Sequence, residues 1–280
     1  MKTRICILIF ILNLFLCVRN SSAQNWQWFN QIGSPGTSQF FPDEFIEDMA
    51  VDADGNVYVC GHTFAGALFN GTPLPGYGDQ DGFVAKFNCA GQMVWYHSVG
   101  SANIDWEYLN HIELSKSGRI YLSGYVLSSN TSPATVIDTT FSTQSGENIL
   151  LCLDTAGNRK WIKFNGGGGA QCIATTRAMG IDKYDNIYVT GGNYNNCQVY
   201  PNLSTPGANL YLAKLDSNGN ALWYKVMDTL DVRFAVDAEG NCYYAGTLYS
   251  PTTINGQLVS PIGATDIIVV KYDSAGNYQY

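Results

Sequence analysis

Short runs of alternating apolar and polar residues, joined by Asp, Asn and Gly, recur along most of the chain. One run reads VDADGNVYVCG at 51–61, and it returns at 114–124, 181–191 and 236–246. Two β-branched and aromatic stretches on either side of a short Gly-containing turn are typical of a β-hairpin. The third copy has Asp185 where the others have glycine, and Asp tolerates the positive φ that such a turn requires. The pattern therefore predicts four hairpins.

A second repeated run lies between the copies of the first. It reads FVAKFNCAG at 83–91 and returns at 149–157, 211–219 and 268–276. Four residues after each closing glycine stands an aromatic residue: Trp95, Trp161, Trp223 and Tyr280. This run also predicts a hairpin, so two hairpins make one four-stranded antiparallel unit of about 60 residues.

A single antiparallel sheet of this kind cannot bury both of its faces, whereas copies stacked around an axis can. The sequence therefore predicts an all-β protein: a β-propeller of about four four-stranded blades in residues 24–280. The expected repeats are 28–94, 95–160, 161–222 and 223–280. Because a tryptophan buries a large apolar area, we expect the repeat tryptophans to dock between neighbouring blades. These are Trp28, Trp95, Trp161 and Trp223.

The segment 28–34 copies 95–101, so it corresponds to the fourth strand of a blade without its first three. The last repeat, in turn, stops at the beginning of its fourth strand. One alternative is a closed four-bladed ring in which 28–32 completes the last blade. The favoured alternative is an open arc or part of a larger propeller. Contacts between 26–32 and 266–272 would distinguish the two.

The repeats resemble the bacterial β-propeller repeat called SBBP, named for a seven-bladed propeller. The resemblance rests on 50–61, 81–87, Gly91 and Trp95, and it extends over nearly all of the chain after residue 24. It implies an exported or cell-surface protein, because members are mostly large proteins of that kind without assigned chemistry. Four repeats are present where the name implies seven, so a fragment of a larger surface protein is a further alternative.

Residues 1–23 have the three parts of a secretory signal peptide. Lys2 and Arg4 precede an apolar stretch at 5–18, and small residues at 21–23 place cleavage after Ala23. The stretch is shorter than the roughly 20 residues that span a bilayer, and no later stretch approaches that length. We therefore expect a secreted or cell-surface protein with no membrane span in the mature chain.

Charge and cysteine content narrow the chemistry further. The formal net charge is -8, which disfavours binding to nucleic acid. Six cysteines remain after the signal peptide, and the spacing of a zinc site is absent. We expect no metal and no cofactor. Cys172 and Cys197 are predicted to form a disulfide on one blade, whereas Cys60, Cys152 and Cys242 fall in strands and should be buried free thiols.

No catalytic constellation stands out. The turns at 52–56 and 216–220 are similar to calcium loops, but a strand follows each directly, which favours turn chemistry. Acids crowd the first repeat, at Asp43, Glu44, Asp48, Asp79 and Asp81. Solvated loop acids are the favoured interpretation. The alternative is a hydrolase or lyase that acts on polysaccharide with acids near a central channel.

Topology predicts where binding would occur. The links between strands two and three are long, at 62–82, 125–147, 192–208 and 247–265, and they share one face of the propeller. Loops on a rigid scaffold often carry function, and exposed aromatics suit protein or carbohydrate surfaces. The leading hypothesis is a non-enzymatic scaffold that binds protein or glycan there. The candidate binding residues are Phe64, Phe69, Tyr77, Tyr125, Phe141, Tyr194, Tyr200 and Tyr249.

Overall fold

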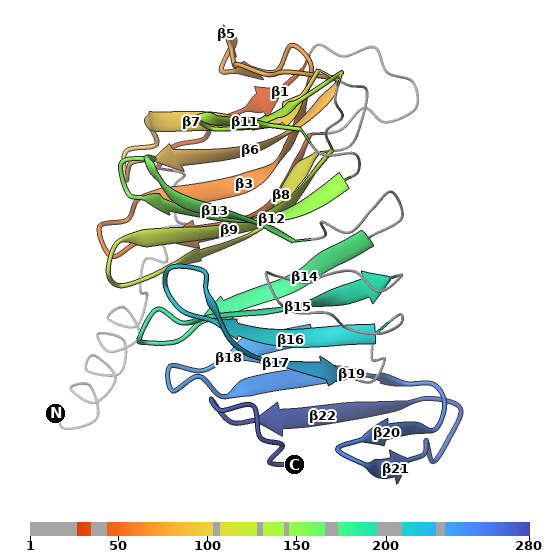
Figure 1. The fold of residues 1–280 in the computed structure, drawn as a ribbon. Coiled ribbons are helices and arrows are strands. Elements are labelled where there is room, and N and C mark those ends of the chain that lie inside the picture. Colours follow the sequence, from red (N-terminus) through yellow and green to blue (C-terminus); the bar gives the residue numbers. More distant parts are fainter. Residues whose placement is uncertain are drawn as a thin grey trace, which may run out of the picture.

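Every regular element in the described part of the chain is a β-strand, as the sequence predicts (Figure 1). The computed structural model describes residues 27–34, 44–102, 107–127, 131–142, 146–165, 173–194, 209–227 and 233–280. The signal peptide at 1–23, Asp43, Cys172, Cys197 and Tyr200 lie outside these residues. The strands form several antiparallel sheets.

The first sheet has six strands in the order β11-β10-β7-β6-β3-β2. Four adjacent strands, β2, β3, β6 and β7, are the two predicted hairpins, and the short strands β10 and β11 extend the sheet beyond β7. The bounds are β2 Phe45–Val51, β3 Val57–Phe64, β6 Gln80–Phe87, β7 Met93–Ser101, β10 Ala134–Val136 and β11 Thr139–Phe141.

The second and third sheets each have four strands, in the orders β13-β12-β9-β8 and β14-β15-β16-β17. The fourth has three, in the order β18-β19-β22. Neighbouring strands are consecutive in the chain except at β9 with β12 and at β19 with β22, where a short hairpin intervenes. The bounds are β8 Tyr108–Leu114, β9 Arg119–Leu127, β12 Gly146–Asp154 and β13 Arg159–Asn165, then β14 Ile173–Ile181, β15 Ile187–Tyr194, β16 Asn209–Leu215 and β17 Ala221–Met227, then β18 Arg233–Val236, β19 Cys242–Leu248 and β22 Asp266–Tyr272.

The turns of the repeated hairpins explain their sequence. Gly55 has a φ of 77°, and Asp185 at the equivalent position of the third sheet has a φ of 63°. Such values belong to the left-handed region, which glycine adopts without penalty and Asp tolerates. The ladder then runs through the alternating residues on each side, from Val51 opposite Val57 to Phe45 opposite His62.

Three short hairpins inside the long links were not predicted. They are β4 Leu68–Phe69 with β5 Thr72–Pro73, β10 with β11, and β20 Thr252–Ile254 with β21 Gln257–Val259. Asn70-Gly71 and Asn255-Gly256 turn two of them, with positive φ at each residue. The Asn-Gly pair is a strong hairpin signal that was present in the sequence.

Successive sheets pack face to face, and each of the three junctions contains an apolar core. Tyr58 and Val84 of the first sheet pack with Leu122 of the second. Tyr121 and Leu150 of the second sheet cluster with residues of the third, and residues of the third cluster with those of the fourth. In Figure 1 the sheets follow one another as layers from the first to the fourth.

The N-terminal strand does not complete the last sheet. Instead, β1 (Ile32–Gly33) pairs with β4, with Ile32 opposite Phe69, in a small sheet of the order β1-β4-β5 formed with the link between β3 and β6. β22 pairs with β19 and, through a single bridge, with Tyr278. In Figure 1, β1 and β22 lie at opposite ends of the stack, so no ring is closed by the described residues. The favoured expectation of an open arrangement agrees with this placement.

Candidate functional site

The repeat tryptophans join one sheet to the next through a turn carbonyl. The indole Nε1 of Trp95 donates to Thr155 O at 3.2 Å, and Trp161 and Trp223 donate in the same way to Ser217 O and Ser274 O. Each accepting carbonyl lies in the turn that follows the third strand of the next sheet: β12, β16 or β22. Trp28 makes the same bond to Cys89 O at 3.1 Å.

The same carbonyls also accept from basic side chains. Lys86 Nζ donates to Thr155 O at 3.1 Å, and Lys214 Nζ donates to Ser274 O at 3.2 Å. Each lysine lies over the buried tyrosine of its own sheet, Lys86 over Tyr58 and Lys214 over Tyr188. A junction therefore consists of a tyrosine, a basic residue and a tryptophan on one sheet and a turn on the next.

The turn glycine is required by this packing. A Cβ on Gly219, whose φ is +75°, would lie 3.0 Å from Cζ3 of Trp161. Gly157 is similarly placed against Trp95. The glycine and the aromatic residue four positions later, which the sequence presents as one motif, thus belong to two different junctions.

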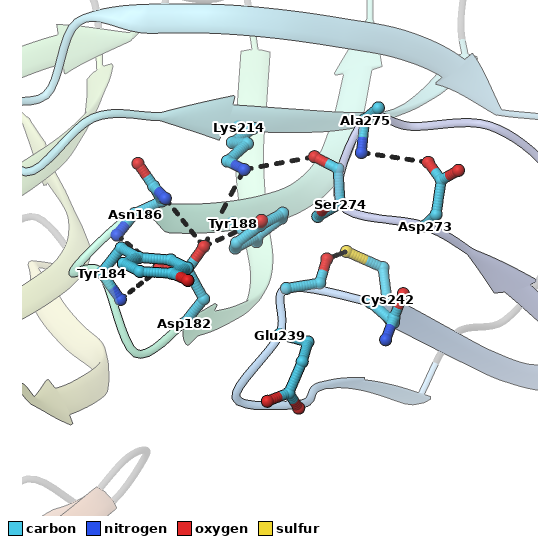
Figure 2. A network of polar contacts seen from close by, with 12 residues as sticks. Asp182, Tyr184, Asn186, Tyr188, Lys214, Glu239, Cys242, Asp273, Ser274 and Ala275 are labelled. Carbon is cyan, nitrogen blue, oxygen red and sulfur yellow. Dashed lines mark hydrogen bonds and ion pairs between the residues drawn. The ribbon is translucent and has the colours of Figure 1, made fainter.

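The Asp residues of the turns use their oxygens within the turn. In Figure 2, Asp182 Oδ1 accepts the N–H groups of Tyr184 and Asn186, and Oδ2 accepts the side-chain amide of Asn186 and the hydroxyl of Tyr188. Lys214 Nζ lies 3.8 Å from Oδ2. The first sheet repeats this arrangement at Asp52, where hydrogen bonds from the turn lower the pKa of a carboxyl that burial by itself would raise. Hydrogen bonds of this kind account for the Asp and Asn of the motif without a calcium ion.

The three cysteines expected to be buried free thiols, Cys60, Cys152 and Cys242, are free and buried. Burial raises the pKa of Cys152 to about 11 and that of Cys242 to about 12. Cys89 is free and exposed. Among the described residues, no group of three or more His, Cys, Asp and Glu is placed to hold a metal ion.

The acids of the first repeat are engaged in backbone contacts. Glu44 accepts Ser34 N, Asp48 accepts Ile112 N, and Asp81 accepts Tyr77 N at 2.6 Å. The bond of Asp48 joins the middle of β2 to the middle of β8, and that of Asp81 holds the loop before β6. Both contacts disfavour the interpretation of Asp48 and Asp81 as solvated loop acids.

Sequence reasoning did not single out Glu107, which lies immediately before β8. Its Oε1 accepts the hydroxyl of Ser101 at 2.7 Å, and burial raises its pKa to about 8. Asp81 is nearby and raises the pKa further, and both side chains are almost completely buried. Two carboxyls therefore come together, but both are closed off from solvent.

The predicted binding aromatics do not form one exposed surface. Phe69 packs on Phe87 with ring centroids 5.6 Å apart, and Phe141 packs on Phe164 at 4.4 Å. Tyr125 stacks on Tyr108, and Phe64 contacts His62 edge to face. Tyr194 ends β15, and its side chain lies outside the described residues. Tyr77 and Tyr249 are exposed.

Among the described residues of the long links, the most exposed apolar side chains belong to the link of the fourth sheet. Tyr249 follows β19, Leu258 lies in β21, and Ile262 lies between β21 and β22. Leu258 is 73% exposed and Ile262 is 99% exposed. We call these three residues the fourth-sheet loop. Figure 1 shows its hairpin, β20 and β21, to one side of β19 and β22.

Comparison with known proteins identifies no family and no function for this chain. No family model and no curated protein matches the sequence. A solved structure of a protein of unknown function from Bacteroides caccae is similar over 69% of this chain and 87% of its own, with 12% identity and a TM-score of 0.22. Among the described residues, no helix is long and apolar enough to cross a membrane.

Proposed function

We propose that this chain is an exported β-propeller scaffold of the SBBP kind and that it binds a protein partner through the fourth-sheet loop. The observation that carries the proposal is the exposure of Tyr249, Leu258 and Ile262 on a single link. Aliphatic side chains open to water are favourable in contact with another protein, because their burial releases hydration water. Carbohydrate would be expected to select aromatic faces, and of the three only Tyr249 offers one.

The stacked sheets support a scaffold role. Their turns are held at each junction by hydrogen bonds from the preceding sheet, so the links between strands two and three are displayed on a rigid base. The burial of Asp81 and Glu107 speaks against the alternative of a hydrolase or lyase, because a substrate would have to reach both carboxyls.

The test uses residues 24–280 with a photoreactive phenylalanine analogue at position 258. A matched control carries it at Tyr184, an exposed aromatic in a short turn of the third sheet. Both are irradiated with envelope proteins of the producing organism, and adducts are identified by mass spectrometry. We expect a defined adduct from 258 and none from 184, and its loss when Tyr249 and Ile262 are changed to Ser.

The same samples are applied to a glycan array and to polysaccharide substrates. Binding to a glycan without a protein adduct would favour the carbohydrate alternative and overturn the proposal. Release of reducing sugar would overturn the non-enzymatic part of it.

A further inference from the structure

The two ends of the stack are exposed at positions that are buried at the internal junctions, or half-buried in the case of Phe234. Met49 of the first sheet is 56% exposed, whereas its equivalent in the second sheet, Ile112, is 3% exposed. At the other end, Val269 of the fourth sheet is 54% exposed and its equivalent in the third, Leu212, is 0% exposed. Each end thus presents one half of a sheet-to-sheet junction.

The face of the first sheet that points away from the second sheet, which we call the front face, contains a pocket. This pocket of about 440 Å³ is lined mainly by apolar side chains, among them Trp28, Ile46, Met49, Val59 and Phe87. In the second sheet the corresponding face is filled by side chains of the first. The pocket is therefore the space that the face of a preceding sheet would fill.

The N-terminal segment already stands in the place of a preceding sheet's fourth strand. Trp28 donates to Cys89 O just as Trp95 of β7 donates to Thr155 O on the second sheet. The ladders agree as well, because Ile32 pairs with Phe69 at the position where Val99 pairs with Val136. Among the described residues, no strands take the places of the first three strands of that preceding sheet.

In the described part of the chain, the fourth sheet lacks a fourth strand, which is the element that the N-terminal segment resembles. In the third sheet, β16 pairs with β17 from Lys214 to Leu210. In the fourth, the equivalent ladder on β22 stops after Lys271, which exchanges backbone hydrogen bonds with Gln279 and Tyr280. Within the described residues, the edge of β22 from Asp266 to Val269 has no strand beside it. An open strand edge of this kind readily accepts a further strand.

The face of the fourth sheet that points away from the third sheet, which we call the outer face, carries the same tyrosine and lysine as the internal junctions. Tyr243 donates to Asp237 as Tyr188 donates to Asp182. Lys271 lies 5.2 Å from the centre of the Tyr243 ring, as Lys214 lies 5.0 Å from that of Tyr188. Within the part of the chain that the structure describes, no turn of a following sheet receives Lys271.

We infer that copies of this chain dock head to tail: the segment 29–33 of one copy pairs with β22 of the next, and the front face of its first sheet covers the outer face of that copy's fourth sheet. The register follows from the third sheet, with Asn30 opposite Val269 and Ile32 opposite Ile267. Lys271 then meets the Cys89 carbonyl of the other copy, as Lys214 meets Ser274 within the chain. The inference rests on the repeated junctions and is independent of the fourth-sheet loop.

A second copy is the occupant that the structure specifies, because the two exposed faces are the two halves of one interface that the chain forms three times. β1 and β22 of one chain lie at opposite ends of the stack (Figure 1). A head-to-tail contact is heterologous, and it either closes into a ring or continues as a fibre. Because propellers hold about four to eight blades, two copies with four sheets each are enough for closure.

The first experiment is disulfide trapping in residues 24–280 carrying Cys89→Ser. Ile32→Cys is combined with Ile267→Cys, and the control combines Gln31→Cys with Ile267→Cys, which places the two thiols on opposite faces of the ladder. We expect reducible species of twice the chain mass or more from the first pair only. A link within single chains, identified by peptide mapping at monomer mass, would overturn the inference, and so would the absence of any link.

The second experiment measures the mass of the unmodified protein in solution by light scattering. We expect a dimer or a longer assembly, which Ile267→Arg converts to monomer. Tyr184→Arg, at an equally exposed position away from both ends, should leave the mass unchanged. A monomeric wild-type protein with a native circular dichroism spectrum would overturn the inference.

Discussion

The buried turn carboxylate of Asp182 provides the sharpest test of how the sheets are held together. Its two oxygens accept four hydrogen bonds at 2.8–3.1 Å, from two backbone amides, the Asn186 side chain and the Tyr188 hydroxyl. The residue is 4% exposed, and Lys214, whose side chain is also largely buried, lies beside it. Asp182→Ala leaves all of these donors without their acceptor.

The magnitude follows from what becomes unsatisfied. Each buried donor that loses its partner costs about 1–3 kcal/mol, and breaking a buried ion pair costs about 3–5 kcal/mol. These costs overlap, because the donors share one carboxylate and water can enter the turn. We therefore expect Asp182→Ala to lower the free energy of unfolding by about 4 kcal/mol. Asp182→Asn keeps one acceptor oxygen and should cost about half as much.

The matched control is Asp154 in the second sheet. It makes the same turn contacts to Ala156 and Asn158, but its charge partner, Lys160, is half exposed and no tyrosine hydroxyl donates to it. Asp154→Ala should cost about 1 kcal/mol, the value typical of a lost cap or exposed pair. Urea unfolding followed by tryptophan fluorescence gives both free energies from the midpoint and slope. Equal losses in the two variants, within about 0.5 kcal/mol, would refute the argument that burial at the junction sets the cost.

Three further expectations follow from the same structure. Burial raises the pKa of Glu107 to about 8 from an ordinary 4.5, so between these pH values the native state keeps a proton that the unfolded state loses, and stability should fall as the pH rises from about 4.5 to about 8. Glu107→Gln should flatten that part of a profile of melting temperature against pH, and an unchanged slope would contradict the expectation. Gly219→Ala should lower the free energy of unfolding in urea by about 2–3 kcal/mol, because the new Cβ meets Trp161 and the residue has a positive φ. Gly256→Ala, at a similar φ in open space, should lower it by about 1 kcal/mol, and similar losses in both variants would count against the role of the indole contact. Cys89 should react with a maleimide in the native protein, and the three buried thiols only after denaturation, as peptide mapping can show; equal rates would be the contrary result.

The repeated hairpins could be predicted because their signal is local. A turn at 52–56 with β-branched residues on both sides fixes strand, register and the conformation of Gly55 within a dozen residues. The tryptophan motif also predicted contact between successive units. What the motif did not reveal is its direction: Trp28 reaches forward to the turn at Cys89, so the N-terminal segment lies on the first sheet.

The long links were predicted less well, because burial there depends on partners far along the chain. Phe69 and Phe141 look like loop aromatics in the sequence, but each lies in a short hairpin that packs against strands of a sheet. Asn70-Gly71 marks one of these hairpins, whereas the turn at Ile137, with a φ of 59°, carries no such mark. The burial of Glu107 likewise results from contacts across the first junction that no local pattern encodes.

Each junction is divided between two neighbouring sheets, and this division allows the number of sheets to change during evolution. The second sheet, for example, contributes the indole of Trp161 to the contact with the third sheet. Through its own turn it also contributes the Thr155 carbonyl and Gly157 to the contact with the first sheet. If a length of chain between equivalent positions, such as Trp95 and Trp161, is deleted or duplicated, each remaining tryptophan still faces a turn carbonyl and glycine of the next sheet. Lineages could therefore lengthen or shorten the array by unequal recombination without redesigning a single contact, and selection would then act on the number of sheets and on the links they display.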